Sequence, residues 1–305
     1  MSLLVVGSVA LDSVETPFEK REEILGGSAS FFCAVAGLLS PTRVVAVVGD
    51  DFPEEHVELL ASGGNDLEGL QRVQGRTFRW SGRYLENMVD RETLDTQLNV
   101  FETFRPQLPA SYADSRYIFL ANILPSLQLD VLDQIDAPKC VASDTMNFWI
   151  TDAHIEALKR VIARSQVVIV NDEEARLLSG EHNLVDAAES IIALGADRVI
   201  VKRGDAGAML FDQEGIFWAP AFPLRRVVDP TGAGDSFAAG FMAYLARTDD
   251  ISPANMRRAM IVGSATGSLA VEAFSVDRFR TLTLDQLQER CQAFAQLTRF
   301  SPIAL

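Results

Sequence analysis

VVIVNDEEARLLSGEHNLVDAAESIIALGADRVIVK, residues 167–202, is the stretch that decides the fold. Two short apolar runs rich in β-branched residues, 167–170 and 199–202, enclose a segment with helical hydrophobic spacing at 184–194. Parallel strands need a long crossover connection, which is usually a helix, so two strands separated by a helix are typical of a parallel pair. The stretch therefore predicts one unit of a parallel sheet covered by helices.

The same alternation of strands and helices extends outward through most of the chain. Further strands are predicted at 3–6, 44–48, 117–121 and 139–143, and further helices at 28–39, 152–164, 235–246, 253–271 and 284–297. Residues 208–211 and 216–218 flank a polar turn and predict a hairpin. We expect an α/β protein with three layers, in which a mostly parallel central sheet is flanked by helices, and a single domain over residues 1–305.

One segment, residues 77–101, interrupts this alternation. Its Thr, Phe, Trp, Tyr and Val residues stand in short stretches with polar alternates and without a helical stripe, which predicts a small antiparallel excursion. We interpret it as a β-rich lid over a site, and an edge hairpin without such a role is the alternative. An apolar lid face would also suit a second copy of the chain, so a homodimer through the lid stays open.

Composition limits the classes of partner. The 305 residues include 42 acidic and 27 basic side chains, for a formal net charge of −15, and such a chain repels nucleic acid. The three cysteines lie far apart without metal-ligand spacing and are expected to be reduced core thiols. The apolar run in MSLLVVGSVALD is too short for a signal peptide or a membrane span. We expect a cytoplasmic protein with no nucleic-acid or membrane partner.

DPTGAGDSFAAGFMAYLAR, residues 229–247, carries the most chemical information, because a glycine-containing loop turns directly into a helix. Gly232 and Gly234 permit tight backbone geometry, so the amides of Ala233, Gly234 and Asp235 are able to point at one spot. The helix dipole favours an anion there, which suits a phosphoryl group in transfer. The position of Asp235 predicts that it caps the helix. Its carboxylate is also able to act as a general base that accepts a proton from a hydroxyl, and the two roles are compatible.

This segment resembles the DTxGAGD signature of the ribokinase, or PfkB, family of carbohydrate and nucleoside kinases. Other family motifs are matched in the family's order, over about residues 3–271. They are a substrate-binding aspartate at Asp12, a glycine pair at Gly26 and Gly27, an NxxE motif at Asn171 and Glu174, and a GxxG loop at Gly204 and Gly207. The resemblance implies a ribokinase-like fold with a small β lid.

The resemblance also implies an activity, the transfer of the γ-phosphate of ATP to a hydroxyl, most readily a hydroxymethyl, of a nucleoside or sugar. Asp235 would be the base, and Gly232, Ala233 and Gly234 would form the anion hole. ATP would be bound by Asn171, Lys202, Gly204 and Gly207, and a magnesium ion would be held through water by Glu174. The acceptor would be bound by Asp12, Gly26, Gly27 and Phe31.

Phe31 is a departure from the family pattern, which often continues as GGxxxN with an asparagine that contacts a sugar. An aromatic surface at this position would favour a flat ring such as a nucleobase, so a nucleoside is favoured over a ribose-like or fructose-like sugar. The alternative is that Phe31 is a core residue of its helix. A second departure, Pro230, is expected to stiffen the loop without touching the chemistry.

Other functions account for the sequence less well. A serine hydrolase of the type suggested by GDS at 234–236 needs a histidine after its serine, whereas all three histidines precede Ser236. A dinucleotide-dependent oxidoreductase is disfavoured because the first turn reads GSVALD instead of GxGxxG. A sugar or nucleotide sensor without turnover remains the alternative of another class. It predicts loss of Asp235 or of the glycine loop, and both are present.

Overall fold

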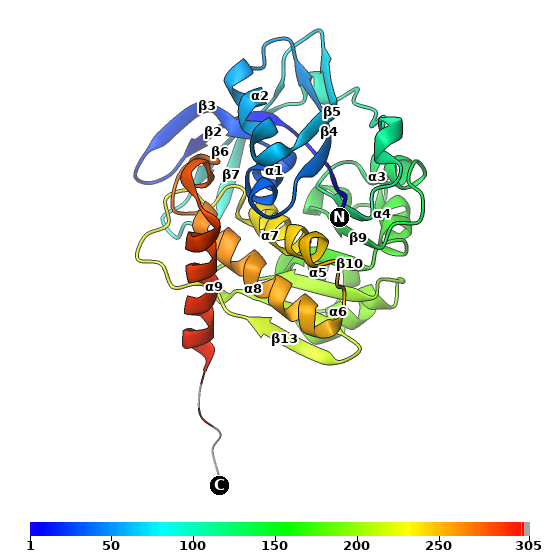
Figure 1. The fold of residues 1–305 in the computed structure, drawn as a ribbon, viewed down its shortest axis with the longest axis vertical. Coiled ribbons are helices and arrows are strands. Elements are labelled where there is room, and N and C mark those ends of the chain that lie inside the picture. The colour runs from blue at the N-terminus through cyan, green and yellow to red at the C-terminus, as the bar shows by residue number, and fades with distance from the viewer. Residues whose placement is uncertain (300, 302–305) are drawn as a thin grey trace.

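The computed structural model describes residues 1–299 and 301, and its centre is a nine-stranded sheet (Figure 1). The strand order is β13-β12-β11-β10-β9-β8-β1-β4-β5. The strands are β1 (Leu3–Val6), β4 (Thr42–Gly49), β5 (Asp66–Val73), β8 (Tyr117–Leu120), β9 (Cys140–Asp144), β10 (Val167–Asn171), β11 (Arg198–Lys202), β12 (Ala208–Asp212) and β13 (Gly215–Ala219). Every neighbouring pair from β5 to β11 is parallel, and β12 and β13 add an antiparallel hairpin at one edge.

Helices cover both faces of this sheet, which confirms the expected three layers (Figure 1). One face carries α1 (Ser28–Leu39), α2 (Glu54–Ala61), α7 (Ala233–Thr248), α8 (Pro253–Ala270) and α9 (Leu284–Thr298). The other carries α3 (Pro125–Leu132), α4 (Ile155–Ile162), α5 (Asp172–Ser179) and α6 (Leu184–Ile192). Leu3 and Val5 of β1 enter the first layer and Leu4 and Val6 the second, because successive side chains of a strand point to opposite faces.

A smaller sheet of four strands in the order β3-β2-β6-β7 lies at the upper left in Figure 1, and we call it the lid sheet. It consists of β2 (Ala10–Glu15), β3 (Lys20–Gly26), β6 (Phe78–Tyr84) and β7 (Arg91–Gln97). The antiparallel pair β6 and β7 comes from the predicted segment 77–101. The prediction was incomplete, because β2 and β3 come from residues 10–26 and β2 pairs in parallel with β6. Two distant segments therefore build the lid sheet.

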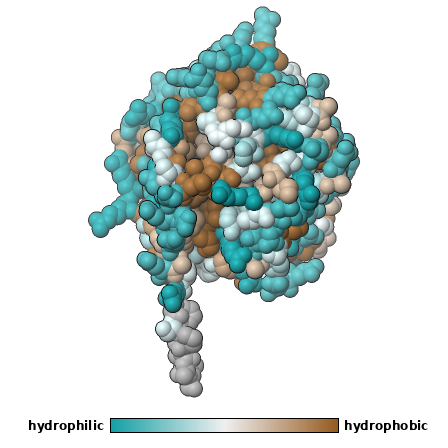
Figure 2. All heavy atoms as spheres, viewed as in Figure 1, coloured by the Kyte–Doolittle hydropathy of each residue, from teal (hydrophilic) through white to brown (hydrophobic). Residues whose placement is uncertain are grey.

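On the face seen in Figure 2, the surface of the protein is mostly hydrophilic. Hydrophobic residues gather in a few patches between the hydrophilic ones. Over the described part of the chain, none of the helices has both the length and the apolar composition that crossing a membrane requires.

Candidate active site

Two predicted site residues, Asn171 and Lys202, lie beside Asp144 where parallel strands of the large sheet end. Asp144, Asn171 and Lys202 are the last residues of three neighbouring strands, β9, β10 and β11. Lys202 Nζ lies 3.4 Å from Asp144 Oδ2, so the strand ends are joined by an ion pair of two largely buried side chains. Ligands of open α/β sheets bind beyond the carboxyl ends of the strands, and this is the end at which the charged groups meet.

Helix α7 begins at this end and supplies the aspartate singled out by the sequence. The helix starts at Ala233 after Gly232, whose φ of 74° is left-handed and therefore favours glycine. Asp235 is the third helical residue, so the expectation that it caps the helix was wrong. The Ala233 amide donates to the Pro230 carbonyl at 3.2 Å. Within the described chain, the amides of Gly234 and Asp235 have no backbone acceptor. The Asp235 amide acts on its own carboxylate, and the Gly234 amide is left for an anion.

The loop before α7 is held by a fully buried carboxylate, Asp229. Its Oδ1 accepts from the Thr231 amide at 2.9 Å, and its Oδ2 accepts from the Ser275 amide at 3.2 Å. The hydroxyl oxygens of Thr231 and Tyr84, a residue of β6, lie 3.2 Å apart. The lid sheet therefore touches the loop that precedes Asp235.

Asp12 lies on β2 of the lid sheet and faces the same region. Its side chain is buried, and Oδ1 has no hydrogen-bond partner within the described chain. A side chain at Gly26 would overlap the Asp12 carboxylate, and Gly27 has a φ of 89°, so the glycine pair is what lets this carboxylate lie against the backbone. Burial, with the charges of Asp229 and Asp235, raises the pKa of Asp12 to about 8. An unsatisfied buried acceptor of this kind suits a ligand hydroxyl.

The electrostatics of Asp235 are set by its surroundings. Burial and then the charge of Asp144 raise its pKa to about 7, against the opposing charges of Lys202 and Arg91. Burial acts to lower the pKa of Lys202, but Asp144, Glu174 and Asp235 outweigh it and the net shift is upward. A carboxylate with a pKa near neutrality is suited to accept a proton at physiological pH.

Gly234 lets Lys202 come close to the start of α7. A Cβ at Gly234 would lie 3.1 Å from Lys202 Nζ, which is tighter than ordinary contact. The ammonium group is therefore adjacent to the amides without a backbone acceptor at the helix start. A cation and such amides at one helix N-terminus favour an anion such as a phosphate.

Asn171 and Glu174 cap α5 reciprocally. Asn171 Oδ1 accepts from the Glu174 amide and Glu174 Oε2 accepts from the Asn171 amide, both at 2.7 Å. The NxxE pattern therefore has a structural role in this helix. Only one carboxylate oxygen of Glu174 is used in this box, and burial raises the pKa of Glu174 to about 7 against the pull of Lys202. A buried carboxylate with a free oxygen fits a magnesium ion held through water.

Gly204 and Gly207 form the turn after β11, with φ values of 52° and 88°. The Arg203 amide donates to the Gly207 carbonyl at 2.7 Å and closes the turn. A side chain at Gly207 would collide with the carbonyl of Ala219, whereas no atom lies within 4 Å of the position of a Cβ at Gly204. The backbone at Gly204 is therefore open to a ligand, as expected of a nucleotide loop.

Phe31 is a core residue. Its side chain is 2% exposed within the cluster that packs α1 and α7 on the large sheet, and its ring lies against Gly232. This geometry agrees with the alternative stated from the sequence and lends no support to an aromatic contact with a substrate. The ring instead supports the turn that starts α7.

Three residues near the site had no role in the sequence-based interpretation. Asp229 anchors the loop, Tyr84 contacts it from the lid sheet, and Arg91 of β7 acts electrostatically on Asp235. The signature DPTGAGD contained a signal for Asp229, because its first residue matches the family pattern. No pattern in residues 77–101 predicted how β6 and β7 pair, and this pairing is what places Tyr84 and Arg91.

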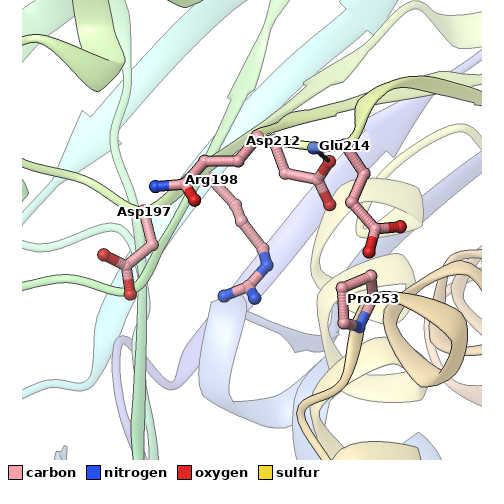
Figure 3. Close-up of a pocket in the computed structure, with 6 residues that line it drawn as sticks. Asp197, Arg198, Asp212, Glu214 and Pro253 are labelled. Carbon is pink, nitrogen blue, oxygen red and sulfur yellow. Dashed lines mark hydrogen bonds between the residues drawn. The ribbon is translucent and has the colours of Figure 1, made fainter.

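A separate hollow lies at the opposite end of β11, beside the turn between β12 and β13 (Figure 3). It contains none of the predicted site residues. Its lining is mostly charged or polar and consists of Asp197, Arg198, Asp212, Gln213, Glu214 and Pro253. We therefore place the candidate active site at the carboxyl ends of the strands.

Known proteins resemble this chain over most of its length. A cytidine kinase of Thermococcus kodakarensis is 29% identical over 256 residues, which cover 81% of this chain and 89% of the relative. An ATP-dependent ribose-1-phosphate kinase of Halopiger xanaduensis is 32% identical over 284 residues, 85% of this chain and 89% of the relative. The structure of aminoimidazole riboside kinase from Salmonella enterica, complexed with aminoimidazole riboside and an ATP analogue, superposes with a TM-score of 0.73 at 24% identity and covers 95% of this chain and 100% of the other.

The family model described as pfkB family carbohydrate kinase matches residues 3–280. That range includes the large sheet, the lid sheet and every residue of the candidate site. The chain therefore belongs to the pfkB family of carbohydrate kinases.

Proposed function

We propose that this phosphotransferase moves the γ-phosphate of ATP to a hydroxyl, preferably a hydroxymethyl, of a nucleoside, with Asp235 as the general base. The observation that carries the proposal is a carboxylate whose pKa is about 7, at a helix start where the amides of Gly234 and Asp235 have no backbone acceptor. A base and an anion site on one helical turn are what transfer of a phosphoryl group to an alcohol requires.

Each part of the site has a task in this reaction. Asp12 binds an acceptor hydroxyl through its unpartnered Oδ1, and Asp235 takes the proton of the hydroxyl that attacks. The amides of Gly234 and Asp235 stabilise charge on the transferred group, and Lys202 adds a positive charge beside them. Glu174 and Asn171 would hold the magnesium ion, which when bound neutralises charge on the phosphates of ATP.

The choice of acceptor now rests on different support. Burial of Phe31 removes the reason that the sequence gave for a nucleobase. A nucleoside is still favoured, because a cytidine kinase and an aminoimidazole riboside kinase are among the relatives. A sugar acceptor is the second candidate, supported by the ribose-1-phosphate kinase among the relatives. The alternative of another class is a sensor that binds these ligands without turnover.

Release of ADP from Mg-ATP tests the proposal across a panel of nucleosides, free sugars and sugar phosphates. We expect turnover with at least one nucleoside and its loss in the Asp235→Asn variant. Turnover with sugars alone would replace the nucleoside by the second candidate. Binding of nucleotide and nucleoside in calorimetry without turnover of any compound would establish the sensor and refute the kinase proposal.

A further inference from the structure

Two arginines of the lid sheet, Arg21 and Arg91, lie on the face that touches the DPTGAGD loop, and Arg21 is paired with Glu19. In the antiparallel pair of β6 and β7, Arg91 lies opposite Tyr84, and Glu92 lies opposite Arg83. Directly opposed residues share a face of a sheet, and successive residues alternate between faces. Arg91 is therefore on the face of Tyr84, and Arg83 is on the other face.

Contacts of Tyr84 show which way that face is turned. Tyr84 is 4% exposed, and its hydroxyl lies 3.2 Å from the hydroxyl of Thr231 in the DPTGAGD loop. Val14 of β2 and Phe274, which follows α8, pack in the same hydrophobic cluster as Tyr84. The face that carries Arg91 thus meets the loop that precedes α7.

Arg91 differs from the two arginines of β6 in its partners. Arg83 Nε lies 2.8 Å from Glu15 Oε1, and Arg79 Nη2 lies 2.8 Å from Glu23 Oε2. Arg91 forms no ion pair within the described chain, and its guanidinium carbon lies 5.8 Å from the ring centroid of Trp80. The guanidinium also acts on the Tyr84 hydroxyl as a hydrogen-bond donor. Its remaining donors stay available for an anion.

The positive charge of Arg91 acts on Asp235. It is among the groups that oppose the rise in the pKa of Asp235. Together with the contact between Tyr84 and Thr231, this effect indicates that Arg91 adds positive charge to the site from the lid sheet.

We propose that Arg91 is the contact of the lid sheet to the transferred phosphoryl group, provided when Tyr84 meets Thr231; this rests on the proposed function. In the reaction, the acceptor oxygen bonds to the γ-phosphorus as the bond to the β-phosphate oxygen breaks. The electron pair leaves with ADP and the hydroxyl proton moves to Asp235. Arg91 exchanges no proton and donates hydrogen bonds to the phosphoryl oxygens, opposite Lys202.

Arg91→Ala tests this role, with Arg83→Ala as the matched control from the other face of the same hairpin. We expect Arg91→Ala to lower kcat by about 100-fold, the usual effect of removing one donor to a developing charge, while KM for the acceptor changes by less than about threefold. Arg91→Lys retains the positive charge but lacks the planar set of guanidinium donors, so it should recover part of kcat. Arg83→Ala should stay within about threefold of the parent in kcat, since it only breaks a surface ion pair.

A binding measurement separates this inference from the proposed function. Calorimetry gives the dissociation constants of Mg-ADP and of a non-hydrolysable Mg-ATP analogue. Arg91→Ala should weaken binding of the triphosphate by about tenfold and leave the diphosphate unchanged, as expected for loss of one charge-assisted contact. This result would support the inference even if the parent protein phosphorylated no acceptor, in which case the proposed function alone fails.

Other outcomes would overturn the role of Arg91. An unchanged kcat would show that Arg91 does not contact the transferred group. A raised acceptor KM at constant kcat would place Arg91 at an anionic group of the acceptor instead. Equal losses of kcat in Arg83→Ala and Arg91→Ala would mean that activity depends only on the total charge or the folding of the hairpin.

Discussion

Asp235→Asn is the sharpest test of the site, because the amide keeps the shape of the side chain and removes its ability to take a proton. General bases contribute about 10²–10⁴-fold, so kcat should fall within that range while nucleotide still binds. Because the pKa of Asp235 is raised to about 7, kcat/KM of the parent should rise with pH up to about 7 as this carboxyl ionises, and then level off. Release of ADP, measured from pH 5 to pH 9, gives both results.

The same substitution has a predicted effect on stability. The pKa of Asp235 rises from 3.8 to about 7 on folding, mainly through burial, so ionisation disfavours the folded state. The contribution of Asp235 to the stability of the folded state is fully retained below pH 3.8 and is lost progressively as the pH rises to about 7. About three pKa units at about 1.4 kcal/mol each give a cost of at most about 4 kcal/mol above pH 7. Asp235→Asn removes this cost, so at pH 8 the variant should unfold at a higher urea concentration than the parent.

Three results would refute this account of Asp235. Turnover of Asp235→Asn within tenfold of the parent would remove the role of base. If the residual kcat/KM of the variant still rose with pH as it does in the parent, the titrating group would be another carboxyl, such as Glu174 or Asp12. A gain in urea stability that stays constant from pH 8 down to pH 4 would show that it does not arise from ionisation. Asp130→Asn, on the exposed face of α3, serves as the control.

Three other substitutions test separate parts of the site. Gly234→Ala places a methyl 3.1 Å from Lys202 Nζ and should lower kcat by about tenfold in a folded protein; full activity would mean that Lys202 moves freely. Glu174→Gln preserves the capping box of α5 and removes the charge, so the magnesium concentration for half-maximal rate should rise at unchanged melting temperature, and an unchanged requirement would exclude Glu174. Asp12→Asn should raise the acceptor KM less than Asp12→Ala does; equal effects would contradict binding through a neutral carboxyl.

Much of the large sheet was predictable from the sequence, because its central strands are buried on both faces and read as continuous apolar runs. The predicted strand 3–6 and helix 28–39 coincide with β1 and α1. The strand β3 was missed because its first four residues, 20–23, are exposed and charged and show no alternation. The helix α5 was missed because it follows β10 directly, so its acidic first turn was read only as a motif.

The candidate site was predictable where a motif fixes local backbone geometry. The glycine turn before Asp235 and the GxxG loop are short-range features, and both have the positive φ values that favour glycine. Side-chain direction was not predictable: Phe31 takes a core position because of the packing of α1 against α7, which residues 26–32 do not encode alone. The ion pair of Lys202 with Asp144 joins residues 58 positions apart, so only the strand order brings them together.

The two aspartates that we propose face the acceptor differ in their surroundings. Burial raises the pKa of both, to about 8 for Asp12 and to about 7 for Asp235. The charges of Asp229 and Asp235 raise the pKa of Asp12 further, whereas Lys202 and Arg91 counteract the shift of Asp235. A neutral carboxyl both donates and accepts hydrogen bonds, which suits binding of a hydroxyl, and an ionised one suits proton abstraction. In the proposed reaction, the lid sheet and helix α7 thus each supply one carboxyl to the same acceptor, and the two carboxyls have different tasks.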